Sequence, residues 1–354
     1  MSVKCEEKVL EQTLFFRNHY SEWEKKKWNL LRMMDFIEGK PDEIHNICIV
    51  GSPYCLMLYL LCVGDIPHTL FLFHGHYPLK AAADVLRSYG APCLFLSYDE
   101  HMAGESAAFG ELIHQVSWQQ YDVNIYGQDT VPVIMCFRHN RFVLLEDGLI
   151  SYISKEDLGK TCGVQVYTYE TWVKKILFIG LAPIPRELKN KSNIIRIENL
   201  WKQKTSLEKN MILSIFRFDD VAMRQCIESG RDTIVFTRNY SKVGKCTKKN
   251  QIALYKEIVG KYNPDSVILK PHPNDDIDYE TYFPECMILP KDLPAEIMWL
   301  CGLPIKAVVG VDIYSNVFGT FRDRVRVDLF PELSEKYNII SLRKKACQRD
   351  DVIN

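Results

Sequence analysis

Residues Val267 to Asp275 read V-I-L-K-P-H-P-N-D, and this stretch is the most informative in the chain. Three apolar residues at strand spacing end in Lys270, and His272 follows between two prolines. Pro271 and Pro273 fix their own φ angles and favour extended geometry in the residues before them. The pattern predicts an imidazole held at the carboxyl end of a strand, where open α/β sheets bind their ligands. We therefore expect an anion site around Lys270 and His272.

Outward from this stretch, the chain alternates short apolar strands with helical segments from residue 46 onward. The expected strands are residues 46–50, 70–73, 93–96, 133–137 and 142–145, then 233–237, 267–270, 287–289 and 307–311. Such alternation indicates α/β units with mainly parallel sheets. A chain of 354 residues is long enough for two such domains.

We expect an α/β fold of two Rossmann-like domains that face each other across a cleft. The expected boundaries are an N-terminal helical extension at residues 1–40, domains at 41–185 and 186–330, and a C-terminal tail or helix at 331–354. A connection with two prolines, residues 180–193, would join the domains.

The composition and charge of the chain exclude some classes of partner and location. The net charge of −1 argues against a nucleic-acid partner, because no basic excess is available to neutralise phosphates. The 12 cysteines include no C-x-x-C pair, which is typical of a reducing cytosol. The N-terminus shows no secretory signal, and the most hydrophobic run, residues 55–63, is too short to span a bilayer. These features predict a soluble cytoplasmic protein.

Three further motifs could carry chemistry. Glu146 and Asp147 precede a glycine directly after the strand R-F-V-L-L, either as an ordinary turn or as a general base at a strand end. Glu296 lies in the first turn of a helix, as a capping residue or as a partner for ribose hydroxyls. Ser315 and Asn316 follow the strand A-V-V-G-V-D-I, where a hydroxyl either caps a helix or binds a phosphate.

The chain resembles the bacterial sialyltransferases of the GT-B type in the order and spacing of four motifs: E-D-G, K-P-H-P, P-x-E-I and a serine after a strand. The chain looks closest to the lipooligosaccharide sialyltransferase family, glycosyltransferase family 52. The resemblance covers roughly residues 46–321. It departs from the family where Asn316 takes the place of a second hydroxyl residue, and where the segment before the first strand is longer.

This resemblance implies an inverting transfer of sialic acid from CMP-sialic acid to a hydroxyl of a galactoside-type glycan, in lipooligosaccharide or capsule. Glu146, beside Asp147, would be the general base, and His272 the general acid at the CMP phosphate. The donor-binding residues would be Lys270, Pro273, Glu296, Ser315, Asn316 and Thr237. We place Gly51, Ser52 and His74 near the acceptor.

No metal and no cofactor are expected, since a monophosphate leaving group needs less charge neutralisation than a diphosphate. The expected partners are the CMP-sugar donor and the glycan acceptor. Peripheral contact with a membrane-borne acceptor at the inner face of the cell membrane, and a homodimer, are further expectations.

Several alternatives remain open. Asp276 and Asp278 form a D-x-D triplet, the metal-binding signature of the other large glycosyltransferase fold. His74 and His76 could form a metal pair, although a third ligand is missing nearby in the sequence. Nucleotide-sugar 2-epimerases and polyol-phosphate transferases share the two-domain plan, and the E-D-G motif favours the sialyltransferase over both. Transfer of another CMP-activated sugar stays open, because some relatives of the family transfer other sugars. A non-catalytic binding protein is the third class.

Overall fold

The computed structural model describes residues 44–74, 79–96, 123–128, 134, 137, 140–158, 166–311, 321 and 324–339. The predicted helical extension at residues 1–40 and most of the predicted tail lie outside these ranges. No helix within the described ranges combines the length and apolar character that crossing a membrane requires.

The first sheet has seven strands, all parallel, in the order β3-β2-β1-β4-β5-β6-β7. Its strands are β1 (Asn46–Val50), β2 (Thr69–His74), β3 (Cys93–Leu96), β4 (Asn124–Gln128), β5 (Arg141–Leu145), β6 (Val173–Phe178) and β7 (Ser192–Ile194). The chain direction across the sheet reverses between β1 and β4. In doubly wound sheets, ligands bind in the crevice at the carboxyl ends of the two strands on either side of this point.

The strand pattern of the first sheet differs from the prediction at β4, β6 and β7, where the sequence indicated no strand. β4 replaces the expected strand at residues 133–137, of which the structure describes only Ile134 and Phe137, neither in a strand. Gly127 fits β4 because a Cβ atom there would lie 3.0 Å from Cζ of Phe142. β7 pairs with β6, so the first sheet extends past residue 185, where we expected this domain to end.

The second sheet has five parallel strands in the order β10-β9-β8-β11-β12. They are β8 (Thr233–Phe236), β9 (Val267–Lys270), β10 (Met287–Ile288), β11 (Ala307–Gly310) and β12 (Arg326–Leu329). The reversal of direction falls between β8 and β11. Two sheets of this kind confirm the predicted α/β architecture of the GT-B type.

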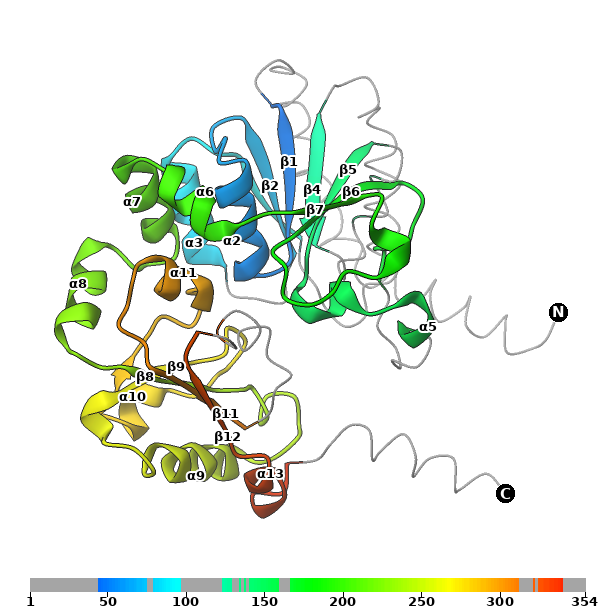
Figure 1. The fold of residues 1–354 in the computed structure, drawn as a ribbon. Helices are drawn as coiled ribbons and strands as arrows, with labels where there is room; N and C mark the ends of the chain where they lie inside the picture. Colours follow the sequence, from blue (N-terminus) through cyan, green and yellow to red (C-terminus); the bar gives the residue numbers. More distant parts are fainter. Residues whose placement is uncertain are drawn as a thin grey trace, which may run out of the picture.

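Helices cover both sheets (Figure 1). The α-helices are α2 (Pro53–Cys62), α3 (Lys80–Ser88), α5 (Lys155–Leu158), α6 (Ile197–Gln203), α7 (Ser206–Ile215), α8 (Asp220–Glu228), α9 (Lys248–Val259), α10 (Tyr279–Tyr282), α11 (Ala295–Leu300) and α13 (Glu332–Lys336). Short 3-10 helices are η3 (Gly148–Tyr152), η4 (Arg186–Leu188) and η5 (Pro264–Ser266).

The segment that joins the two sheets packs mainly on the first one. α6 contacts α2 and α7 contacts α3, and Figure 1 shows these four helices together. The largest hydrophobic core includes Leu145 and Leu177 of the first sheet as well as Ile234 and Ile268 of the second. This continuous core holds the carboxyl end of the first sheet close to the second unit.

Candidate active site

Glu146 is buried, and its carboxyl group accepts three hydrogen bonds from other parts of the first unit. It follows β5 directly and has no exposed surface. The Tyr54 hydroxyl, from the start of α2, donates a hydrogen bond to Oε1. The Tyr152 hydroxyl, from the end of η3, donates to Oε2 at 2.5 Å, and the backbone N–H of Ile179 donates to the same oxygen at 3.0 Å. Three elements of the first unit therefore fix this carboxyl group.

Burial raises the pKa of Glu146 from 4.5 to about 7. The hydrogen bonds from Tyr152, Tyr54 and Ile179 pull the pKa down, while the nearby Glu296 carboxyl raises it. Desolvation outweighs the three donors because it acts on the whole charge. A carboxyl group with a pKa near neutrality is suited to proton transfer at physiological pH.

The two residues after Glu146 shape the turn. Gly148 has a φ angle of 61°, in the left-handed region where a side chain would be strained, which explains the glycine of the E-D-G motif. Asp147 is half-buried, and it accepts a hydrogen bond from the side chain of Gln128 at the end of β4. Its backbone N–H donates to Oγ of Ser151 at 2.8 Å. Asp147 thus ties β4 to the turn.

His272 lies on the loop after β9, as predicted. Its Nδ1 accepts a hydrogen bond from the backbone N–H of Asn274 at 3.1 Å, so in the neutral ring Nε2 carries the proton. Its own backbone N–H donates to Oγ1 of Thr237 at 3.0 Å. Burial lowers the pKa of His272 to about 3, and the positive charges of Arg238 and Lys270 add to this effect. The ring is therefore a neutral hydrogen-bond donor at pH 7.

The cationic side chains of Arg238, Lys270 and Lys242 lie near His272. Arg238 follows β8 and Thr237, next to the point where the second sheet reverses direction. Lys242, which also lowers the pKa of His272, donates to Oδ1 of Asn274 at 2.7 Å. Two positive side chains beside an N–H donor form an environment for an anion. Arg238 is not among the predicted site residues, although it directly follows the predicted strand at 233–237, which lies at the switch point of the sheet.

The side chain of Lys270 forms hydrogen bonds with two backbone carbonyl groups. Its ammonium is buried and donates to the carbonyl of Pro271 at 2.8 Å and to that of Lys291 at 2.9 Å. It therefore fastens the loop after β9 to the loop after β10. Burial lowers its pKa to about 7, against the attraction of the Asp292 and Glu296 carboxyl groups. This position makes Lys270 a support of the His272 loop, and its predicted contact with the donor stays a prediction.

Glu296 connects the two halves of the site. It is the second residue of α11 and only 2% exposed. Its charge influences both Lys270 of the second unit and Glu146 of the first. The E-D-G and P-x-E-I motifs, far apart in the sequence, therefore lie close enough to interact.

The remaining predicted residues are placed only in part. Ser315 and Asn316 lie outside the described residues, as does His76, and the side chain of His74 is not described. Gly51 and Ser52 follow β1 at the switch point of the first sheet, and Ser52 caps α2 by accepting the N–H of Cys55 at 3.1 Å. Pro273 is half-buried beside His272.

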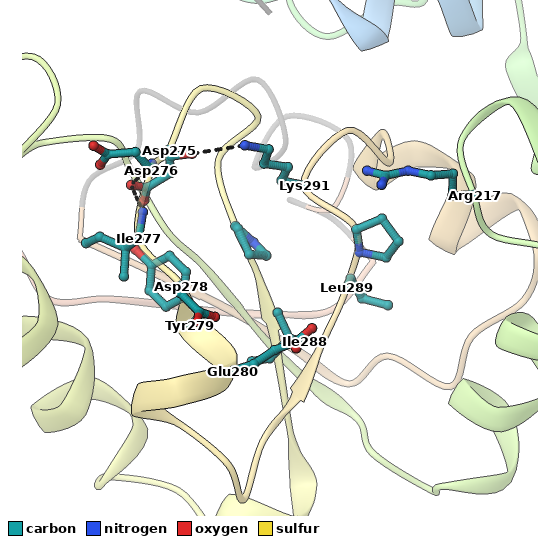
Figure 2. A pocket seen from close by; sticks show the side chains of 12 residues that line it. Arg217, Asp275, Asp276, Ile277, Asp278, Tyr279, Glu280, Ile288, Leu289 and Lys291 are labelled. Carbon is teal, nitrogen blue, oxygen red and sulfur yellow. Dashed lines mark hydrogen bonds between the residues drawn. The ribbon is translucent and has the colours of Figure 1, made fainter. Parts of the chain in front are cut away.

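A cavity of about 520 Å³ is lined by the loop after β9, the start of α10 and the loop after β10. Figure 2 shows Lys291 reaching across it toward Asp275, whose carbonyl it contacts at 3.3 Å. Asp276 and Asp278, the D-x-D pair, line this cavity. Asp276 forms an ion pair with Lys248 at 2.9 Å, and Asp278 accepts the Thr281 hydroxyl at 2.7 Å. Both carboxylates thus have partners within the protein.

Comparison with known proteins identifies the class. The sequence model of glycosyltransferase family 52 matches residues 127–309, and the chain belongs to this family. An uncharacterized protein of Haemophilus influenzae is 28% identical over 190 residues, which cover 52% of this chain and 61% of the Haemophilus protein. The match therefore spans about three fifths of that relative's length.

Two solved structures resemble the chain at low identity. One is a Listeria monocytogenes protein assigned as a UDP-N-acetylglucosamine 2-epimerase, with a TM-score of 0.45, 10% identity, and coverage of 77% of this chain and 75% of that one. The other is S. aureus MnaA with UDP, with a TM-score of 0.43, 10% identity, and coverage of 76% and 75%. The fold is defined by the strand orders above and not by these two structures.

Proposed function

We propose that this glycosyltransferase moves sialic acid from CMP-sialic acid to a hydroxyl of a galactoside-type glycan, with inversion at the anomeric carbon. The observation that supports this most is the buried Glu146, whose pKa of about 7 suits a base, and which interacts with Glu296 of the second unit. Family membership supports the glycosyltransferase class, and the motifs support the sugar. The acceptor in lipooligosaccharide or capsule, at the inner face of the membrane, belongs to the same proposal.

In the proposed step, the acceptor oxygen forms a bond to the anomeric carbon of sialic acid as the bond from that carbon to the CMP phosphate oxygen breaks. The electron pair of the broken bond leaves with CMP. The acceptor proton passes to Glu146. Positive charge develops on the sugar ring and negative charge on the phosphate, so a carboxylate on one side and donors on the other stabilise the transition state.

Tyr54 would join the acceptor to Glu146. The carboxyl group has no exposed surface, whereas Tyr54 is half-buried and donates to it. A hydroxyl that reaches Tyr54 could pass its proton to the phenol oxygen while the phenol proton moves to Glu146. The pKa of Tyr54 is held well above 10, chiefly by burial, so the phenol would remain protonated before and after the step.

The CMP phosphate would bind beside His272, Arg238 and Lys242. The neutral imidazole would donate from Nε2, which fits the hydrogen bond that Nδ1 accepts from Asn274. A bound phosphate would also raise the pKa of His272, because an opposite charge favours the protonated ring. His272 would then act as a donor first and as an acid once the phosphate is in place.

Nucleotide protection tests the donor class. The melting temperature of the full chain should rise far more with CMP than with UDP or CDP at equal concentration, because the ligand that binds the folded protein stabilises it. A larger effect of UDP would support a nucleotide-sugar 2-epimerase instead. Absence of any nucleotide effect would support a non-catalytic binding protein.

A further inference from the structure

A second cluster of potential ligands lies at the opposite edge of the first sheet, at the amino-terminal ends of β1 and β2. His45 directly precedes β1, His68 directly precedes β2, and Asp65 lies in the loop between α2 and β2. The three are the only group of three His, Cys, Asp or Glu side chains within the described ranges whose ligand atoms are close enough for one ion. Those atoms all lie within 4.8 Å of one another.

The parallel register of β1 and β2 brings the two histidines together. Asn46 pairs with Thr69, so the residues immediately before them are neighbours, and the backbone N–H of His45 donates to the carbonyl of His68 at 2.9 Å. The two rings stack with centroids 4.8 Å apart and an interplanar angle of 27°. Sheet geometry, rather than a mobile loop, therefore sets the spacing of the two imidazoles.

Hydrogen bonds to Thr69, at the start of β2, fix the loop that carries Asp65. The hydroxyl of Thr69 donates to the carbonyl of Asp65, and this fully buried threonine also bonds the hydroxyl of Tyr59 at 2.5 Å. The backbone N–H of Thr69 donates to Ile66 at 3.2 Å. The Asp65 backbone is thus anchored to the core, while its carboxylate lies close to Nδ1 of both rings.

We propose that His45, Asp65 and His68 bind one Zn²⁺ ion. Nδ1 of His68 lies 2.7 Å from Oδ1 of Asp65, and Nδ1 of His45 lies 3.5 Å from Oδ2. Tetrahedral zinc with ligands at about 2.0–2.1 Å places neighbouring ligand atoms about 3.3 Å apart, so small side-chain rotations suffice. Two imidazole nitrogens and one carboxylate oxygen favour zinc over magnesium or calcium.

Charge supports the same assignment. The Asp65 carboxylate contacts both rings, with one oxygen toward Nδ1 of each histidine, so one ion placed among these atoms could be bound by all three side chains. A zinc ion is bound by neutral imidazoles and by the carboxylate together. The side chains of His45, Asp65 and His68 are 56%, 33% and 47% exposed, so an ion can enter and water can complete the coordination.

The site is distinct from the proposed active site. Every strand of the first sheet is parallel, so the residues before β1 and β2 lie at the edge opposite to Glu146, which follows β5. Zinc bound here should stabilise the folded protein and leave sugar transfer unaffected. The proposal is therefore independent of the proposed function.

The test is zinc binding to the full, metal-free chain, measured by calorimetric titration with ZnCl₂, beside the variants His45→Ala and Asp65→Asn. Asp84→Asn is the matched control, since Asp84 is an exposed carboxylate on α3 that pairs with Arg87 at 2.8 Å. Wild type and control should bind one zinc with a common affinity, and each variant should bind at least about tenfold more weakly. Equal binding by all four proteins, or none in the wild type, would overturn the proposal.

Cobalt distinguishes this site from the cysteines. Co²⁺ bound to nitrogen and oxygen gives weak visible absorption, whereas thiolate ligands add an intense charge-transfer band in the near ultraviolet. The wild type should show the first spectrum at one equivalent, and Asp65→Asn should lose it. A thiolate band that persists in both variants would assign the metal to cysteines and contradict the proposal. Equal melting temperatures of all proteins in EDTA would show that the variants fold.

Discussion

The hydroxyl of Tyr54, on the first turn of α2, donates a hydrogen bond to Oε1 of Glu146, the residue that follows β5. The two residues are 92 positions apart in the sequence. Their contact joins the helix after β1 to the E-D-G turn at the carboxyl edge of the first sheet. Because Glu146 has no exposed surface, the proposed transfer of the acceptor proton would run through this hydroxyl.

Removing this hydroxyl should slow transfer more than removing that of Tyr152. Tyr54→Phe interrupts the proposed path of the proton, and we expect kcat to fall by about 10²–10⁴-fold. Tyr152→Phe is the matched control, since it removes the other phenol from Glu146 and leaves Tyr54 in place. Equal losses of kcat in the two variants would argue that both tyrosines act only through packing.

The Tyr152→Phe variant should also shift the pH profile. The hydrogen bond from Tyr152 favours the carboxylate and lowers the pKa of Glu146, so its loss should raise that pKa above about 7. The acid limb of kcat/KM against pH should then move to higher pH. A limb that stays in place, or moves to lower pH, would show that another group controls it.

Stability should depend on Glu146 in a defined pH window. The folded protein keeps the Glu146 proton up to a pKa of about 7, whereas the unfolded chain releases it near 4.5, so this group costs stability as pH rises between these values. Glu146→Gln removes that dependence. Relative to wild type, the variant should gain about 3 kcal/mol of unfolding free energy between pH 4.5 and 7.

Denaturant unfolding at pH 5 and pH 8 measures this gain. Glu280→Gln, at an exposed position on α10, is the matched control. A difference between Glu146→Gln and wild type that does not change with pH would mean that Glu146 is already ionised at pH 5 in the folded protein.

Arg238 should contribute to CMP binding. A charge-assisted hydrogen bond is worth about 1.5–3 kcal/mol, so Arg238→Met should weaken CMP binding by about 10–100-fold. The effect should shrink for cytidine, which has no phosphate. Arg224→Met serves as control, because Arg224 is exposed on α8 and bonds the backbone of Asp220 at 3.1 Å. Equal loss for CMP and cytidine would place Arg238 away from the phosphate.

Transfer should survive chelation. Asp276 is paired with Lys248 and Asp278 with Thr281, so the D-x-D carboxylates already have protein partners. Activity in excess EDTA should equal activity without it, even if the zinc site at His45 loses its ion. If EDTA abolished transfer and Mg²⁺ or Mn²⁺ restored it, the prediction would be wrong, and the D-x-D pair would become a candidate metal site of the enzyme.

Parts of this arrangement were predictable, and the reasons are physical. Continuous apolar runs such as 46–50 and 267–270 identify buried parallel strands, and both were placed correctly. β4 reads N-I-Y-G-Q, and its glycine and polar ends weaken the strand signal, although Gly127 is required there by close packing. A β-strand of three residues such as β7 has too little pattern to be recognised inside a lysine-rich connection.

The candidate site was predictable as motifs and not as contacts. E-D-G and K-P-H-P pointed to Glu146 and His272 because both follow strands. The partners of these residues come from distant parts of the chain: Tyr54 contacts Glu146, and Arg238 lies near His272. Local sequence patterns do not reveal which distant hydroxyl or cation will contact a given residue in the fold. The neutral state of His272 likewise depends on burial and on nearby cations that only the fold brings together.

The central claim is tested most directly by incubating the full chain with CMP-sialic acid and a panel of galactosides, and measuring both CMP release and the sialylated product. Wild type should form product in step with CMP. Glu146→Gln should retain CMP binding and lose transfer by about 10²–10⁴-fold, with Asp147→Asn as the matched comparison. Failure of wild type to sialylate any galactoside while it consumes a UDP-sugar, or a Glu146→Gln rate above a tenth of wild type, would contradict the account.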